Sequence, residues 1–240
     1  MKIETPQYFL EELTKKYDVD QLGLGYTSHY ASLFDSIRGE VTKVLEIGVE
    51  TGRSHRMWLE YFPNATIYGL DVMNENDRSG YVKEFHELQE GNPNLDRSVI
   101  FKGDQENVDD LNKFLSLYGK DFDIIIDDGG HTMRQQQISL GILFDAVKSG
   151  GYYVIEDLHT CSGQWQTLYG YEVIEEGDTL TTDLLKSIEK GDDSVTETNY
   201  LTKDVLDNIR NNVKSSRVAI GKMTYQNYQW PTMLSFTEKK

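Results

Sequence analysis

Two apolar segments, each followed immediately by a pair of carboxylates, most limit how this chain can fold. Phe122–Ile126 runs into Asp127–His131, and Tyr152–Ile155 runs into Glu156 and Asp157. The residues between them have a helical pattern, and the order strand, helix, strand is that of a parallel βαβ unit. Both strand ends then lie at one edge of a sheet, where ligands bind. Carboxylates gathered there repel one another unless a cation or a ligand lies among them.

A second unit of this kind comes earlier in the chain. Lys43–Gly52 has the pattern of a strand and a glycine-bearing turn, Arg53–Phe62 that of a helix, and Thr66–Leu70 that of a strand ending at Asp71. Gly48 allows a close approach of backbone and ligand, and Asp71 is placed to accept hydrogen bonds from ribose hydroxyls. The unit predicts an adenosine-containing ligand. The alternative is that the glycines serve turn geometry and the aspartate caps the strand end.

The remaining patterns complete an α/β fold. Ser98–Phe101 is a further strand, and eight residues separate the last two, Val218–Met223 and Thr232–Phe236. So short a link favours an antiparallel hairpin, because a parallel crossover needs about a dozen residues. We predict a seven-stranded, mostly parallel sheet with an antiparallel C-terminal strand. Helices are predicted at residues 4–17, 30–37 (with Thr27 or Ser28 as N-cap), 53–62, 81–89, 182–190 and 203–213.

Several polar or aromatic residues have two interpretations. Asp104, after the third strand, is suited either to an adenine amino group or to capping the helix that begins near Val108. His29 and His131 could each contact a ligand or cap a helix. The aromatic residues of the segment after the second carboxylate pair could stack on an acceptor or pack that segment down. These aromatic residues are Trp165, Tyr169 and Tyr171.

Length and charge narrow the class of protein. The 240 residues suit a single domain (1–240), with an N-terminal helical segment at 1–38 and a helical insertion or lid at 159–215. A net charge of −16 argues against nucleic acid or an anionic membrane as partner and favours a small molecule. With one cysteine, Cys161, and no apolar leader, we expect a cytoplasmic protein, compatible with a homo-oligomer.

The glycine turn distinguishes between adenosine ligands. Nicotinamide-binding domains use closely spaced glycines to hold a pyrophosphate. Here Glu50 replaces the middle glycine of a G-x-G-x-G turn between Gly48 and Gly52, and its charge would repel a pyrophosphate. S-adenosylmethionine has no phosphate, and its cationic sulfonium tolerates nearby acids. Together with the antiparallel hairpin, this turn indicates a methyltransferase.

At this point the chain resembles a known family, the class I S-adenosylmethionine-dependent O-methyltransferases of macrolide deoxysugars, which includes the macrocin and mycinamicin enzymes. The similarity covers roughly residues 20–160 and, in outline, the C-terminal hairpin. It implies a Rossmann-like class I methyltransferase fold. The matching segments are Lys43–Gly52, Tyr68–Asp71, Gly103–Gln105, Asp121–His131 and Gly150–Asp157.

The resemblance implies a role for each matching residue. Asp128, Glu156 and Asp157 would hold a divalent cation, Mg²⁺, and His131 would be the general base. The residues implied in binding S-adenosylmethionine are Glu46, Gly48, Asp71 and Asp104. We also expect Gly52 and Asp127 to bind this cofactor, although an acid at a strand end such as Asp127 could instead cap a helix. The chain departs from the family pattern at Gly130, where a serine is usual, and at Ser149, where a proline is usual.

The chemistry supports this assignment independently. A sugar hydroxyl is a weak nucleophile because its pKa lies far above neutrality, and a coordinated cation lowers that pKa so that a histidine can take the proton. Two neighbouring hydroxyls would bind the cation best, so the expected acceptor is a vicinal diol on a sugar or glycoside. One alternative is a catechol-type O-methyltransferase acting on an aromatic diol. Another is a non-catalytic module that only binds S-adenosylmethionine.

Overall fold

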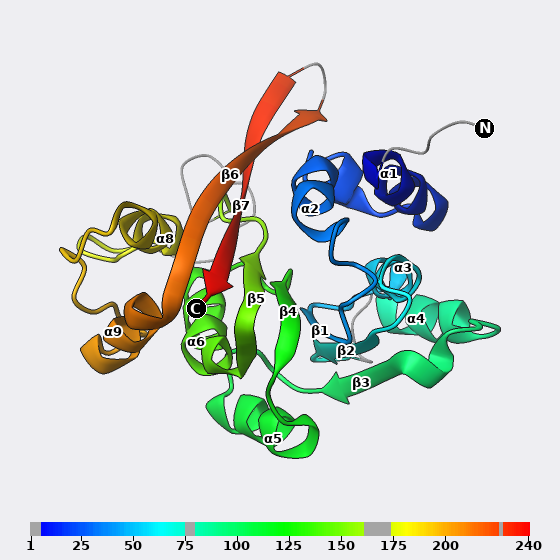
Figure 1. The fold of residues 1–240 in the computed structure, drawn as a ribbon, viewed down its shortest axis with the longest axis horizontal. Coiled ribbons are helices and arrows are strands. Elements are labelled where there is room, and N and C mark those ends of the chain that lie inside the picture. Colours follow the sequence, from blue (N-terminus) through cyan, green and yellow to red (C-terminus); the bar gives the residue numbers. More distant parts are fainter. Residues whose placement is uncertain (1–5, 75–79, 161–173, 226–227) are drawn as a thin grey trace.

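A seven-stranded sheet with the order β3-β2-β1-β4-β5-β7-β6 forms the centre of the molecule (Figure 1). The computed structural model describes residues 6–74, 80–160, 174–225 and 228–240. Neighbouring strands from β3 to β5 pair in parallel, whereas β7 is antiparallel to both β5 and β6. The predicted fold class is therefore confirmed. The strands are β1 (Lys43–Ile47), β2 (Thr66–Asp71), β3 (Ser98–Lys102), β4 (Phe122–Asp127), β5 (Val147–Ile155), β6 (Val213–Tyr225) and β7 (Tyr228–Lys239).

The predicted helices are confirmed to within a few residues at their ends. They are α1 (Pro6–Tyr17), α2 (Thr27–Phe34), α3 (Arg53–Tyr61), α4 (Tyr81–Gln89), α5 (Val108–Tyr118), α6 (Met133–Leu143), α8 (Thr181–Lys190) and α9 (Lys203–Asn212), with short 3₁₀ helices η1 (Asp20–Leu22), η2 (Leu95–Arg97) and η3 (Phe144–Ala146). Among the helices that the structure describes, none is long and apolar enough to cross a membrane.

The start of α2 differs from the prediction. Neither Thr27 nor Ser28 is the N-cap, because Tyr26 already has helical backbone angles (φ −82°, ψ −27°) and no side chain caps the helix. The Tyr26 carbonyl accepts hydrogen bonds from the amides of His29 (2.9 Å) and Tyr30 (3.1 Å). The tight turn after η1 thus leads directly into the helix.

Each face of the sheet is buried under helices, as the alternation of side chains along a strand requires. On one face, Val44 and Ile124 pack with Trp58 of α3 and with residues of α1 and α2. On the other, Leu45 and Ile125 pack with residues of α5, α6, α8 and α9. The carboxyl ends of the parallel strands remain between these two layers, and this edge forms the site.

The C-terminal hairpin is longer than predicted. Strands β6 and β7 pair from Val213↔Lys239 to Tyr225↔Tyr228, so the eight-residue link expected from the sequence is largely strand. Figure 1 shows the hairpin extending past the other strands. The added residues include Lys214, Ser215 and Ser216, which lack the apolar alternation that marks a half-buried strand. Backbone pairing joins these residues to β7, together with side-chain hydrogen bonds to Glu238 and Thr237.

Part of the predicted helical insertion at 159–215 packs on the sheet. Leu185 of α8 and Ile209 of α9 are buried in the same cluster as Val147 and Tyr153 of β5. Trp165, Tyr169 and Tyr171 lie outside the described residues, so their two interpretations stay open.

Candidate active site

A cavity of about 710 Å³ lies at the carboxyl ends of the parallel strands. Its wall includes residues that follow β1, β2, β3, β4 and β5, which is where a doubly wound sheet binds ligands. The predicted site residues in this wall are Gly48, Asp71, Asp104, Asp128, His131 and Asp157. The others, Glu46, Gly52, Asp127 and Glu156, lie outside the wall.

Asp71 holds the glycine turn in place. Its Oδ2 accepts hydrogen bonds from the amides of Val49 (2.8 Å) and Glu50 (3.0 Å), and its Oδ1 accepts one from Met73 (2.7 Å). Gly48, at φ +84°, lies so close to the β4 loop that a Cβ there would be 2.1 Å from the Asp128 carbonyl oxygen. Only glycine fits at position 48, because the turn Gly48–Gly52 packs directly against the loop Asp128–His131, called the acidic loop below.

Gly52 and Glu46 have neighbours within the protein. Gly52, at φ +79°, faces α4, and a Cβ there would be 2.8 Å from a ring carbon of Phe85. Glu46 is buried on β1, and its Oε2 lies 2.9 Å from Nδ1 of the buried His55. In this structure Gly52 packs against α4 and Glu46 pairs with a histidine of α3, so both contact other parts of the protein and neither lines the cavity.

Asp127 positions the acidic loop through a glutamine. The Asp127 carboxylate is buried and accepts hydrogen bonds from Ser139 Oγ and, at 3.0 Å, from Gln105 Nε2. Gln105 Oε1 in turn accepts a hydrogen bond from the Gly130 amide (2.7 Å). A Cβ at Gly129 would be 1.9 Å from Gln105 Oε1. Burial raises the pKa of Asp127, partly offset by the hydrogen bonds from Ser139 and Gln105.

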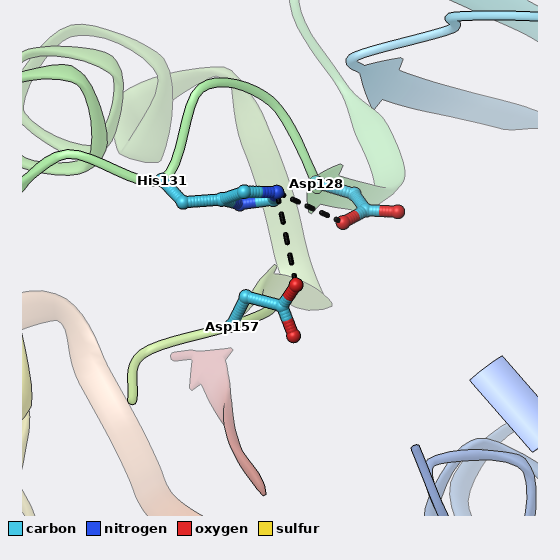
Figure 2. Close-up of side chains that lie close together, drawn as sticks. All are labelled: Asp128, His131 and Asp157. Carbon is cyan, nitrogen blue, oxygen red and sulfur yellow. Dashed lines mark ion pairs between the residues drawn. The ribbon is translucent and has the colours of Figure 1, made fainter. Parts of the chain in front are cut away.

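Asp128, His131 and Asp157 converge on one point. Figure 2 shows the imidazole of His131 directed at both carboxylates; its Nε2 is 4.0 Å from Asp128 Oδ1 and 3.7 Å from Asp157 Oδ2. His131 (φ +61°) and Asp157 (φ +53°) both have left-handed backbones, a strained state for residues with a Cβ and one that is concentrated at functional sites. One ligand atom from each residue lies within 4.8 Å of the others, a spacing suited to a metal ion.

Glu156, the third predicted metal ligand, is buried and is not part of this group of ligand atoms. Its Oε1 accepts a hydrogen bond from the buried Tyr30 hydroxyl, whereas its buried Oε2 has no hydrogen-bond partner among the described residues. Burial and the charges of Glu156 and Asp157 raise the pKa of Asp128 well above its usual range. Burial also raises the pKa of Glu156, despite the hydrogen bond from Tyr30. Carboxylate oxygens with uncompensated charge fit a hard divalent cation such as Mg²⁺.

Three donors from the N-terminal segment were not predicted from the sequence. Tyr26 Oη donates to Asp157 Oδ1 (2.8 Å), Tyr30 Oη to Glu156 Oε1, and Gln21 Nε2 to Asp128 Oδ2 (3.3 Å). In the sequence, Tyr30 is recognisable only as a member of an apolar helix face. Burial and the nearby carboxylates raise the pKa of both tyrosines, which keeps the hydroxyls protonated as donors.

The capping alternatives for Asp104 and His131 are not observed. The N-cap of α5 is Asn107, whose side chain accepts from the amides of Asp109 and Asp110, and the N-cap of α6 is Thr132. His29 contacts the hairpin, with Nε2 3.4 Å from the Ile220 carbonyl oxygen, and does not line the cavity.

Comparison with known proteins gives the family. The chain is 35% identical over 188 residues to mycinamicin VI 2''-O-methyltransferase of Micromonospora griseorubida, covering 75% of this chain and 43% of that enzyme. It is 34% identical over 188 residues to demethylmacrocin O-methyltransferase of Streptomyces fradiae, again covering 75% of this chain and 43% of the enzyme. Over this part of its length the chain belongs to the macrolide sugar O-methyltransferase family.

The structure of the MycE methyltransferase in complex with Mg, SAH and mycinamycin VI agrees with this assignment. It superimposes with a TM-score of 0.64 and 31% identity, covering 96% of this chain and 54% of that one. This member of the sugar O-methyltransferase family therefore spans about half the length of its relatives or less. No family model matches the chain.

Proposed function

We propose that this chain catalyses S-adenosylmethionine-dependent, Mg²⁺-dependent methylation of a hydroxyl group on a sugar or glycosylated small molecule. One observation carries the proposal. A single cavity has the glycine turn that begins at Gly48, with Asp71, in one part of its wall, and the cluster of Asp128, His131 and Asp157 in another. The two halves of a methyl transfer, a donor site and an acceptor site, would then share one cavity.

The charge of the cavity supports S-adenosylmethionine as the methyl donor. Asp20, Glu50, Asp71 and Asp104 all line it, and carboxylates favour a cationic sulfonium over a pyrophosphate. Asp71 already accepts backbone hydrogen bonds on both oxygens. Each carboxylate oxygen has a further lone pair, so a ribose hydroxyl can still bind there.

His131 is the proposed general base. Asp128, Asp157 and Glu156 would hold Mg²⁺, and the ion, when bound, would supply the positive charge that makes an alcohol proton more acidic. His131 Nε2 would accept that proton as the alcohol oxygen takes the methyl group from sulfur. The strained loop around His131 would hold its ring at the acceptor oxygen.

The acceptor class follows from the relatives. Two other relatives act, by their names, on glycosylated compounds, a rhamnosyl tetracenomycin C and L-olivosyl-oleandolide. A sugar with adjacent hydroxyls is therefore the acceptor to test first.

A methyl-transfer screen over glycosides and catechols, run with Mg²⁺ and with EDTA, tests the proposal. We expect transfer to a glycoside, nearly abolished by EDTA and restored by added Mg²⁺. Activity that EDTA leaves unchanged would remove the metal from the mechanism. Cofactor binding without transfer to any diol would instead favour a binding module, and transfer to catechols alone an aromatic acceptor.

A further inference from the structure

The three acids near the cavity share a pattern of hydrogen bonding. Each has one carboxylate oxygen held by a neutral donor from residues 21–30. Asp128 Oδ2 accepts from Gln21 at 3.3 Å, Asp157 Oδ1 accepts from Tyr26 at 2.8 Å, and Glu156 Oε1 accepts from Tyr30. These donors are buried.

For Asp128 and Asp157, the oxygens that these donors leave face the histidine of the cluster. Asp128 Oδ1 and Asp157 Oδ2 are the atoms that face His131 Nε2, at 4.0 and 3.7 Å. Glu156 Oε2 is the buried atom with no hydrogen-bond partner among the described residues. The donor segment thus fixes which oxygen of Asp128 and of Asp157 faces His131, and which oxygen of Glu156 stays without a hydrogen bond among the described residues.

The segment is itself fixed to the C-terminal hairpin. The Leu24 carbonyl accepts a hydrogen bond from the buried Thr232 hydroxyl (2.7 Å), and Tyr26 Oη also donates to the Met233 carbonyl (3.2 Å). Gly25, at φ +78°, packs so closely on β6 that a Cβ there would be 3.0 Å from the Lys222 amide. The donors therefore cannot follow the acids freely if these rotate.

We propose that Gln21, Tyr26 and Tyr30 are positioning residues that set the metal selectivity of the site. By holding one oxygen of each acid toward a fixed donor, they would orient each carboxylate so that only its other oxygen faces the ion. Mg²⁺ accepts such ligands in a strict octahedron at about 2.0–2.1 Å, whereas Ca²⁺ takes about 6–8 oxygens at 2.3–2.6 Å and uses bidentate carboxylates. The arrangement would favour Mg²⁺ over Ca²⁺. This inference rests on the proposed function, because it takes the acids to be the metal ligands.

Calorimetric titration of the purified protein with MgCl₂ and, separately, CaCl₂ tests the inference without an activity assay. We expect the wild type to bind Mg²⁺ more tightly than Ca²⁺. Tyr26→Phe, Tyr30→Phe and Gln21→Met each remove one donor and release one carboxylate oxygen. Each should weaken Mg²⁺ binding by about tenfold or more, the usual effect of losing a residue that supports a metal ligand. Ca²⁺ binding should change much less, so the ratio of Mg²⁺ affinity to Ca²⁺ affinity should fall in each variant.

Tyr61→Phe is the matched control. Tyr61 is also fully buried, and its hydroxyl also donates to a carboxylate, Asp35 Oδ1 at 2.8 Å, but Asp35 is not one of the proposed metal ligands. This variant should keep the wild-type ratio of Mg²⁺ to Ca²⁺ affinity. Thermal melts followed by circular dichroism identify any variant that does not fold, and the other two donors then carry the test.

The possible outcomes separate the two proposals. A wild-type protein that binds neither ion contradicts the metal site of the proposed function. A wild type that binds Ca²⁺ as tightly as Mg²⁺ overturns the selectivity inference and leaves the methyl-transfer proposal standing. Donor variants that bind both ions more weakly by the same factor would also overturn the selectivity inference, because a purely structural role of these residues gives that result.

Discussion

Replacing Gly48 by alanine tests the contact on which the whole site depends. The added Cβ would lie 2.1 Å from the Asp128 carbonyl oxygen and 2.7 Å from Gly129 Cα. These are backbone atoms, so no side-chain rotation relieves the overlap. The β1 turn and the acidic loop must separate by roughly 1 Å, a displacement comparable to those that lower catalytic rates about 100-fold.

Two costs add at this position. A residue with a Cβ at the left-handed φ of +84° costs about 1–2 kcal/mol. Overpacking against a fixed backbone costs about 1–3 kcal/mol more. The free energy of unfolding of Gly48→Ala should therefore fall by about 2–5 kcal/mol relative to the wild type.

Gly191→Ala separates the two costs. Gly191 also has a left-handed backbone, at φ +65°, but an added Cβ there has no atom within 4 Å. This variant should lose only the conformational part, about 1–2 kcal/mol. Urea denaturation of both variants measures the difference, and a methyl-transfer assay should show activity lost only in Gly48→Ala. Equal destabilisation of the two variants, with both active, would refute the close contact between the two loops.

Two further predictions concern His131 and Asp123. Asparagine tolerates the left-handed backbone of residue 131, so His131→Asn should keep the stability of the wild type. Its kcat should fall by about 100- to 10,000-fold, the usual contribution of a general base. A smaller loss in the transfer assay would argue against this role. Burial alone would raise the pKa of Asp123, but the ion pair with Lys148 and hydrogen bonds from Thr42 and Lys43 lower it below its usual range. The folded state therefore binds this proton less tightly than the unfolded state, so its stabilisation is full above about pH 4 and is lost as the pH falls through the lowered pKa. Asp123→Asn should remove that part of the acid dependence in denaturation curves taken between about pH 6 and pH 3, and an unchanged dependence would show that other acids account for it.

The order of strands and helices could be predicted because it is encoded locally. Apolar runs such as Phe122–Ile126, the glycine turn at Gly48 and the short link before β7 each specify an element or a connection from neighbouring residues alone. The same patterns place Asp71, Asp128 and Asp157 at strand ends, and the structure brings these residues to one cavity. What local patterns do not describe is the length of β6 and β7, since backbone pairing extends them through polar residues.

The donors to the acids could not be predicted, because they are distant in sequence. Gln21 and Asp128 are 107 residues apart, Tyr30 and Glu156 are 126 apart, and Tyr26 and Asp157 are 131 apart. A tyrosine on an apolar helix face gives no sign that its hydroxyl meets a carboxylate. Only the packing of α2 against the sheet, beside the hairpin, brings these groups together.

The different environments of Asp127 and Asp128 show why the sequence alone does not reveal the role of each acid in a pair at a strand end. Consecutive side chains of a strand point to opposite sides. Asp127 ends β4 on the side of α6, where Ser139 and Gln105 satisfy it in full burial. Asp128 points the other way, into the cavity with His131. The paired acids that mark the site in the sequence thus divide between holding the loop and facing the ligand, and the sheet register decides which acid does which.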